Sequence, residues 1–333
     1  MSKKGNEQMA PELLRVDGLT VEYWTRKGRI RAVDDMSFSI AKSETLGVVG
    51  ESGSGKSTLG LSLIGLIPFP GKITKGKVVL KGKEVLKMSK EDMRNLRGTE
   101  VCYVFQDPMT SLNPVKKIGS HFVELIQTHE PKVKKEEALE RSRKLLKDVG
   151  IQPERVNDYP HQLSGGMRQR VMIALAIALN PSLVVADEPT TALDVIVQAK
   201  ILDLLNTLRD SYGMALILIT HDLSIVMERS DKILIMYAGQ MIEYAPSEEL
   251  YSNPQHPYAK GLLKSIPNIE LADQKLEAIP GSPPDLLNPP DGCRFWPRCG
   301  YAFDRCRKEA PPLYTTGEEH LVRCFLYDEE KKD

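Results

Sequence analysis

The sequence Gly50-Glu51-Ser52-Gly53-Ser54-Gly55-Lys56-Ser57 decides the fold of this chain. It follows a short apolar run, residues 45–49, and leads into residues 58–64, whose leucine spacing suits a helix. The glycines let the backbone curl so that successive N–H groups point inward, and the helix that follows adds the positive end of its dipole. We therefore predict a strand, a phosphate-binding loop and a helix, in that order.

The residues that close this loop indicate which anion it binds. Lys56 can reach the β- and γ-phosphates of a nucleotide, and the Ser57 hydroxyl is placed to bind the Mg²⁺ that accompanies them. Thr58, at the start of the helix, completes the predicted set of phosphate contacts. The alternative is a glycine-rich turn that matches this pattern by chance, and the motifs further along the chain argue against it.

The composition excludes several classes of protein. The chain has 333 residues, in which 45 basic and 45 acidic residues cancel, so a dedicated nucleic-acid binder or a polybasic membrane anchor is not indicated. The longest apolar run, residues 171–179, is far shorter than a bilayer crossing, and residues 1–8 are polar and do not resemble a secretory signal. We expect a cytoplasmic protein.

Two strands are expected before the phosphate loop. Residues 13–23 and 31–40 both alternate partially between apolar and polar side chains, and turn residues bound them. Tyr23 lies at the end of the first run, where an aromatic ring can stack on a nucleotide base. Its residue type alone favours an ordinary strand aromatic.

A helical insertion is expected after the next two strands. Residues 77–80 and 101–105 read as strands, with a helix over 91–97 between them. Gln106 follows the second strand directly, at the end where open α/β sheets place their ligand contacts. The turn-rich residues 107–114 then lead into helical periodicity over 115–149.

A second possible anion site lies at the start of a later helix. Ser164, Gly165 and Gly166 precede the helical residues 168–179. Taken alone, this pattern favours a plain serine N-cap. Two phosphate-binding elements in a chain with one nucleotide would suggest that the nucleotide is shared.

Acidic residues and a histidine follow two further apolar strands. Residues 183–186 end in Asp187 and Glu188, and such a pair is costly to bury unpaired, so it implies a cation or a proton-transfer role. We expect Asp187 to hold Mg²⁺ and Glu188 to orient the attacking water; a solvated pair is the alternative. Residues 215–219 deliver His221 to the same edge, where it would contact the γ-phosphate or the water.

Taken in order after the phosphate loop, these motifs resemble the nucleotide-binding subunit of ABC transporters. The resemblance spans roughly residues 12–265 and implies an α/β P-loop NTPase fold with a mixed sheet, antiparallel N-terminal strands and a helical subdomain at about 107–180. It implies that two such domains pair head to tail, with ATP between Lys56 of one and Ser164, Gly165 and Gly166 of the other. It also implies that Tyr23 stacks on the base, that Asp194 belongs to the nucleotide-binding set, and that Gln106 joins the catalytic set and the Mg²⁺ site and links the nucleotide to the membrane subunits. No motif is degenerate, so a site competent for hydrolysis is expected.

Finer features look like the ATPases of oligopeptide and dipeptide importers. These are residues 105–114, residues 253–258 and a proline-rich tail with cysteines. The resemblance implies two membrane permease subunits, a second ATP-binding subunit (related or identical), an indirect link to an extracytoplasmic solute-binding protein, and a place on the cytoplasmic face of the membrane. Importers of nickel or other small solutes look similar. A third class, ABC-type ATPases acting on nucleic acid or ribosomes, often has two nucleotide domains or a coiled-coil arm, and neither is present here.

We expect a domain boundary near residue 266, with residues 267–333 forming an irregular, proline-rich extension. Cys293, Cys299, Cys306 and Cys324 would form one tetrathiolate site in it. The lack of a close cysteine pair favours a [4Fe–4S] cluster over zinc, and free thiols or disulfides are the remaining alternatives. Neighbouring arginines would offset the thiolate charge; they are Arg294, Arg298, Arg305, Arg307 and Arg323.

Overall fold

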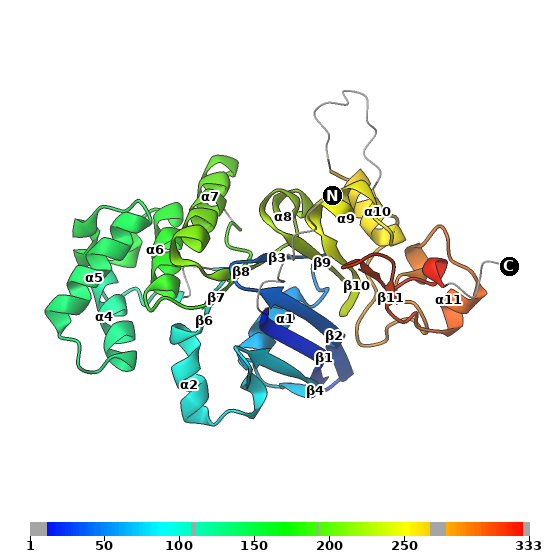
Figure 1. The fold of residues 1–333 in the computed structure, drawn as a ribbon, viewed down its shortest axis with the longest axis horizontal. Helices are drawn as coiled ribbons and strands as arrows, with labels where there is room; N and C mark the ends of the chain where they lie inside the picture. The colour runs from blue at the N-terminus through cyan, green and yellow to red at the C-terminus, as the bar shows by residue number, and fades with distance from the viewer. Residues whose placement is uncertain (1–11, 108–110, 192, 267–277, 329–333) are drawn as a thin grey trace, which may run out of the picture.

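An eight-stranded mixed sheet forms the centre of the molecule in the computed structural model, which describes residues 12–107, 111–191, 193–266 and 278–328 (Figure 1). The strand order is β11-β12-β10-β9-β3-β8-β7-β6. Strands β6, β7, β8, β3 and β9 run parallel, and β10, β12 and β11 add antiparallel strands at one edge. The bounds are β3 Thr45–Val49, β6 Val101–Val104, β7 Leu183–Asp187, β8 Ala215–Thr220, β9 Lys232–Tyr237, β10 Gln240–Pro246, β11 Tyr314–Thr315 and β12 Leu321–Val322.

The central strands are buried on both faces, as their continuous apolar sequences predict. Every residue of β3, β7 and β8 is buried. Because parallel strands end at the same edge, the polar residues that follow them gather there: the phosphate loop after β3, Asp187 and Glu188 at the end of β7, and His221 after β8. The sheet thereby positions the site.

A second, antiparallel sheet packs beside the first, in the order β2-β1-β4-β5. Its strands are β1 Glu12–Thr25, β2 Gly28–Ala41, β4 Gly71–Leu80 and β5 Lys83–Glu84. Buried residues recur along β1 and β2, which confirms the two predicted N-terminal strands. Tyr23 lies near the end of β1 and Ala32 on β2, both beside the phosphate loop. The predicted α/β fold with antiparallel N-terminal strands is confirmed.

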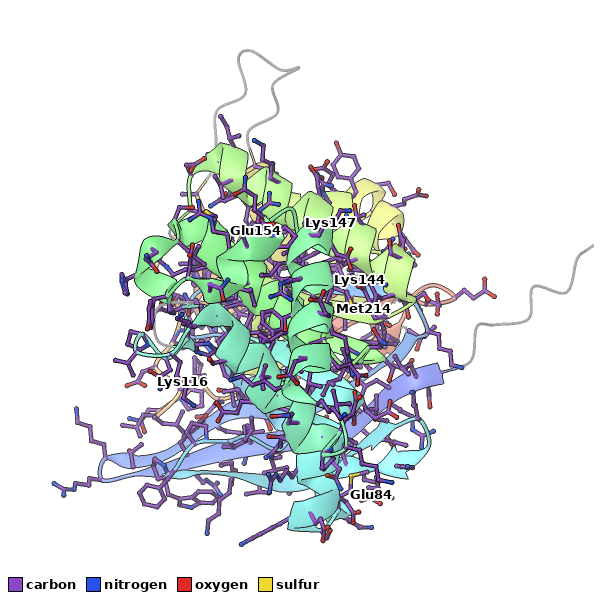
Figure 2. The ribbon with its side chains drawn as sticks, turned by 90° about the vertical axis from the view of Figure 1, so that its left-hand side faces the viewer. Glu84, Lys116, Lys144, Lys147, Glu154 and Met214 are labelled. Atoms are coloured by element: carbon purple, nitrogen blue, oxygen red, sulfur yellow. The ribbon has the colours of Figure 1, made fainter. Side chains whose placement is uncertain are left out.

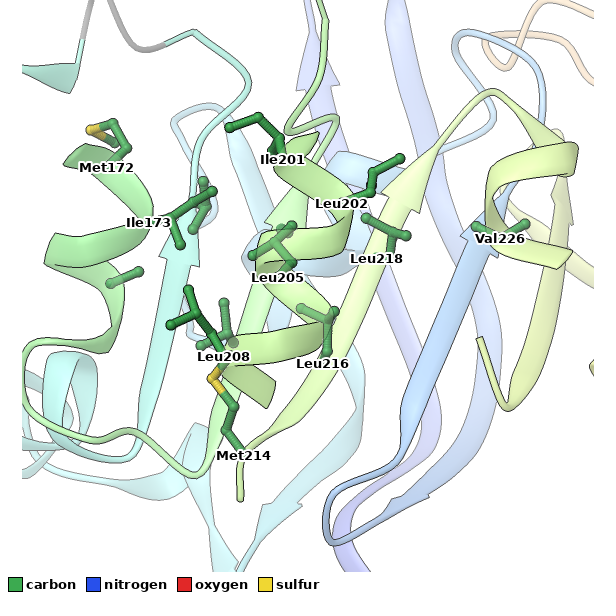
Figure 3. Packing of buried hydrophobic residues seen from close by; sticks show 14 of the residues in the cluster. Met172, Ile173, Ile201, Leu202, Leu205, Leu208, Met214, Leu216, Leu218 and Val226 are labelled. Atoms are coloured by element: carbon green, nitrogen blue, oxygen red, sulfur yellow. The ribbon is translucent and has the colours of Figure 1, made fainter. Parts of the chain in front are cut away.

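Helices cover the central sheet. Those that flank it are α1 Lys56–Leu63, α2 Lys90–Thr99, α7 Val195–Tyr212, α8 Leu223–Arg229, α9 Ser247–Ser252 and α10 Pro257–Lys264. Leu205 and Leu208 of α7 and Leu216 of β8 belong to one buried apolar cluster (Figure 3). The helix ends at Gly213, which has φ 63°, a left-handed conformation that glycine adopts without a Cβ penalty.

A helical arm extends from the β6 end of the sheet (Figure 1). It comprises α4 Ile118–His129, α5 Lys135–Asp148 and α6 Gly165–Ile177. Helix α5 is amphipathic: Leu145 and Leu146 are buried, while Lys144 and Lys147 are exposed at the end of the molecule that Figure 2 views. The core of the arm is therefore built by facing apolar stripes, as the 115–149 periodicity predicts.

The C-terminal extension, residues 278–328, packs against the opposite edge of the sheet (Figure 1). Its longest helix among the described residues is α11, Asp304–Lys308. Strand β12 pairs with β10, with Leu321 opposite Tyr244, so the extension continues the central sheet. Arg294 of the extension forms a buried ion pair with Asp34 at 2.5 Å.

No helix in the described part of the chain is long and apolar enough to cross a membrane. Four residues of the predicted motifs, Pro108, Met109, Thr110 and Ala192, lie outside the described residues.

Candidate functional site

The phosphate loop has the backbone shape that an anion requires. Gly55 caps α1 with φ 101°, and a Cβ at this position would lie 2.0 Å from the carbonyl oxygen of Ala32. Gly53 has φ 78° with open space around it, which leaves room for a phosphate. The N–H groups at the start of α1 and the helix dipole both favour negative charge at this point.

Lys56 closes the loop from the inside. Its side chain is buried, and its Nζ donates to the carbonyl oxygens of Gly50 at 2.7 Å and Glu51 at 3.0 Å. Burial lowers the pKa of this ammonium group, and the neighbouring carboxylates of Glu188, Asp187 and Glu51 oppose that shift. A cation in so dry a setting gains strongly from a phosphate that approaches it.

Two side chains with oxygen atoms that could ligate a metal, Ser57 and Asp187, lie together beside the loop. Ser57 Oγ donates to Oδ1 of Asp187 at 3.1 Å, and the Tyr103 hydroxyl donates to the other carboxylate oxygen, Oδ2, at 2.6 Å. Burial raises the pKa of Asp187, and the two hydrogen bonds oppose it. Hydroxyl and carboxylate oxygens are the hard ligands that Mg²⁺ prefers, so Ser57 and Asp187 fit the predicted magnesium site.

Glu188 is held by three neighbouring side chains. Its Oε2 accepts from Gln106 Nε2 at 3.0 Å and from Thr191 Oγ1 at 2.9 Å, and its Oε1 lies 3.4 Å from His221 Nδ1. Glu188 has φ 43°, an uncommon conformation for a residue other than glycine. Such strain concentrates at functional sites, where the surroundings hold it in place.

Most of these groups line one open cavity of about 660 Å³, although among the described residues Asp187, Tyr103 and Thr191 lie outside its lining. This volume lies within the range of small-molecule sites. Tyr23, Ile30 and Ala32 contribute apolar surface to its lining, and the Tyr23 hydroxyl lies 3.5 Å from Thr58 Oγ1. The structure thus brings together these predicted residues in the lining: Tyr23, Ser52, Gly53, Gly55, Lys56, Ser57, Thr58, Gln106, Glu188 and His221.

The second predicted anion element lies elsewhere. Within the described part of the chain, the lining of this cavity leaves out Ser164, Gly165, Gly166 and Asp194. Ser164 caps α6 by accepting from Met167 N at 3.3 Å, and Asp194 caps α7 by accepting from Val197 N at 3.0 Å. A Cβ on Gly166 would lie 2.8 Å from Val197, so the two helix starts are neighbours on one surface.

Five residues of the site were not among the sequence predictions, and two of them, Ile30 and Ala32, line the cavity beside Tyr23. Tyr103 and Thr191 bond to the two acidic residues, and Leu286 of the extension lines the cavity. A polar partner for Tyr103 could have been predicted, because a tyrosine on a buried strand needs a partner for its hydroxyl. The place of Leu286 could not, since it reaches the site from the far end of the chain.

The iron–sulfur prediction for the extension is wrong. Cys293, Cys299, Cys306 and Cys324 line one small cavity. Among the described residues, which include all four, no group of three or more His, Cys, Asp or Glu side chains is placed to hold a metal ion. Burial raises the pKa of Cys293 to about 11 and that of Cys324 to about 12.

The arginines that were expected to offset thiolate charge have other partners. Arg294 pairs with Asp34, Arg298 with Glu51, and Arg305 with Glu309 and Asp328. Arg323 donates to the backbone of β10, and Arg307 lies 5.2 Å from the centre of the Trp296 ring. The contacts of Arg294, Arg298 and Arg323 therefore attach the extension to the rest of the chain. Those of Arg305 and Arg307 stabilise the extension itself.

Comparisons with known proteins agree with this geometry. Residues 33–191 match the model of the ABC transporter family, and residues 242–306 match that of the oligopeptide/dipeptide transporter C-terminal region. The oligopeptide transport ATP-binding protein AppD of Bacillus subtilis (strain 168) is 47% identical over 321 residues, which cover 96% of this chain and 98% of that protein. This chain belongs to the family of ABC transporter ATP-binding subunits.

Other members of the family extend the comparison. The dipeptide transport ATP-binding protein DppD of Escherichia coli (strain K12) is 45% identical over 314 residues, covering 94% of this chain and 96% of that one. An ATP-binding cassette solved as a dimer with ADP and Pi in a post-hydrolysis state is 27% identical, has a TM-score of 0.64, and covers 71% of this chain and 99% of its own. The present chain is therefore an ATPase of the ABC type.

Proposed function

We propose that this chain hydrolyses ATP to drive the import of oligopeptides or dipeptides through an ABC transporter at the cytoplasmic face of the membrane. The observation that carries the proposal is the near full-length match to ATP-binding proteins of oligopeptide and dipeptide transport, which includes the C-terminal region. The geometry of Lys56, Asp187 and Glu188 at one sheet edge supplies the means of hydrolysis.

The chain's own residues divide the work of hydrolysis between them. Lys56 and the loop N–H groups bind the β- and γ-phosphates, and Ser57 and Asp187 would hold Mg²⁺, which would neutralise charge on the phosphates. Glu188, oriented by Gln106 and Thr191, accepts a hydrogen bond from the attacking water and positions it. His221 stabilises charge that develops on the transferred group.

The catalytic unit in this proposal is a head-to-tail dimer. Ser164, Gly165 and Gly166 at the exposed start of α6 contact the nucleotide held by Lys56 of the partner, and the start of α7 at Asp194 joins the same interface. The partner is a second, related ATP-binding subunit. Two permease subunits bind the dimer, and an extracytoplasmic solute-binding protein delivers the peptide to them.

The test is reconstitution of the complete transporter. The chain is purified from membranes with its bound subunits, placed in proteoliposomes with a peptide-binding solute-binding protein, and assayed for ATP hydrolysis and uptake. Di- to pentapeptides should stimulate both activities, whereas Ni²⁺ should stimulate neither. Stimulation by Ni²⁺ alone, or co-purification with ribosomes in place of membrane subunits, would overturn the proposal.

A further inference from the structure

An arginine of the C-terminal extension grips the phosphate loop. Arg298 Nη1 donates to Oε2 of Glu51 at 2.7 Å, and its Nη2 donates to Oε1 at 3.0 Å. This two-bond geometry between a guanidinium and a carboxylate fixes direction as well as distance. The second residue of the phosphate loop is thus bound by a residue 247 positions later in the chain.

Arg298 is itself held in a rigid setting. Its Nε donates to the carbonyl oxygen of Pro280 at 2.8 Å, and its Nη1 also lies 3.3 Å from the Tyr237 hydroxyl. The guanidinium carbon lies 5.7 Å from the centre of the Tyr237 ring and 5.9 Å from that of Phe295. Only 5% of its side chain is exposed. The extension therefore presents a fixed fork to Glu51, which a mobile surface arginine would not do.

Glu51 transmits this contact to the phosphate-binding lysine. Its carbonyl oxygen accepts from Lys56 Nζ at 3.0 Å and from Ser54 N at 3.1 Å, while its own N–H donates to the Tyr258 hydroxyl at 3.1 Å. The side chain and the backbone of Glu51 are thus both held by hydrogen bonds. A displacement of Glu51 would move the carbonyl that orients Lys56.

Arg298 also cancels a charge at a sensitive place. The Glu51 carboxylate belongs to the loop that receives a triphosphate, and an unpaired carboxylate there would repel it. The bidentate pair removes most of that repulsion without adding a free cation to the site.

We propose that Arg298 is a positioning residue for the ATP site, which holds the phosphate loop in its binding shape and screens Glu51 from the triphosphate. The inference rests on ATP being the ligand of this loop. Through Arg298, the extension becomes a functional part of the nucleotide site. Arg298 acts through Glu51 and touches no reacting atom.

The experiment uses the full chain and four variants: Arg298→Met, Arg298→Lys, Glu51→Gln and the double variant Arg298→Met/Glu51→Gln. Equilibrium binding of ATP, AMP and tripolyphosphate is measured with Mg²⁺, together with kcat, KM and the thermal midpoint. The matched control is Arg305→Met, because Arg305 lies in the same extension and is ion-paired with Glu309 and Asp328.

We expect Arg298→Met to weaken the binding of ATP and tripolyphosphate at least tenfold and the binding of AMP less than threefold. The same variant should raise KM more than it lowers kcat. Arg298→Lys should be intermediate, and the double variant should recover part of the loss, because it leaves no unpaired carboxylate at the loop but does not restore the two-bond hold on Glu51. Arg305→Met should bind all three ligands as the unaltered chain does.

Three results would overturn the inference. The first is wild-type affinity for tripolyphosphate in folded Arg298→Met, and the second is an equal loss for AMP. The third is an equal loss in Arg305→Met, which would indicate a general effect of loosening the extension. If Arg298→Met does not fold, Arg298→Lys and the double variant decide by the same comparison. Failure of the unaltered chain to bind ATP would instead overturn the proposed function.

Discussion

Gln106 Nε2 donates to Oε2 of Glu188 across 3.0 Å, linking the end of β6 to the end of β7. The strand that leads to the helical arm and the strand that carries the proposed catalytic carboxylate are thereby joined through two side chains. A movement of the arm that shifts Gln106 would therefore change the position of Glu188 and of the water that Glu188 is proposed to orient.

Replacing Glu188 with Gln should abolish turnover while preserving nucleotide binding. The amide keeps the shape of the side chain but carries no negative charge, so it accepts a much weaker hydrogen bond from the attacking water and hydrolysis should fall roughly 100-fold or more. ATP should then remain bound and hold the dimer together, which light scattering with Mg²⁺ and ATP would detect. The control is Glu228→Gln, an exposed glutamate paired with Arg229. Wild-type turnover in Glu188→Gln would rule out the assigned role.

Replacing Ser164 with Arg should prevent dimerisation without affecting binding of ATP to the single chain. Ser164 lies outside the cavity that Lys56 lines, at the exposed start of α6, where the proposed partner nucleotide docks. The assay is light scattering in the Glu188→Gln background. Ser89→Arg is a matched control, because Ser89 caps α2 in the same way, by accepting from Asp92 N. If both variants still form ATP-dependent dimers, the head-to-tail arrangement is incorrect.

Replacing Leu286 with Ala should weaken the binding of ATP but leave the binding of tripolyphosphate unaffected. Leu286 lines the same cavity as Tyr23 and Ile30 and offers apolar surface of the kind that suits a base, and it is partly buried. Loss of that apolar contact should raise the Kd for ATP about fivefold. Leu326→Ala, in an exposed leucine of the same extension, should leave it unchanged. An equal effect on tripolyphosphate would contradict a base contact.

The stability of the chain should depend on pH through His320. This fully buried ring lies 2.8 Å from Glu243 and 2.9 Å from Glu249, with Gln255 Nε2 at 3.4 Å. Burial alone would lower its pKa, but the hydrogen bonds to the two glutamates outweigh burial and raise the pKa above the ordinary 6.5. The stabilisation is thus complete below that value and is lost as pH rises through the raised pKa.

Thermal midpoints measured from about pH 6 to 9 would check this dependence. The midpoint of the unaltered chain should fall across that window, and His320→Gln should flatten the decline. His161→Gln, at an exposed histidine, should retain it. An identical slope in His320→Gln would show that another group titrates.

The sheet and the site at its edge could be predicted because their signals are local. Apolar runs that end in Asp187 and Glu188, or in His221, identify strand ends from a few adjacent residues. Parallel pairing then brings those ends together without further information. Tyr103 and Thr191 escaped prediction because their roles depend on the direction of one hydroxyl, which the sequence pattern does not show.

The extension was harder to interpret because its contacts are remote in sequence. The four cysteines predict a metal centre, and the arginines between them are predicted to offset its charge. In the structure Arg294, Arg298 and Arg323 reach the nucleotide domain instead. Which carboxylate an arginine pairs with is decided by tertiary packing, and spacing along the chain says nothing about it.

The pairing of β12 with β10 has a practical consequence. Strand β10 would otherwise be an open border of the sheet, whose unpaired N–H and C=O groups invite other chains to add on. In a chain shortened to residue 266, this edge of β10 would be exposed. The buried Glu243 carboxylate would also lose its interaction with His320. Such a truncated protein should aggregate, so the nucleotide domain and its tail have to be produced, studied and altered as one folding unit.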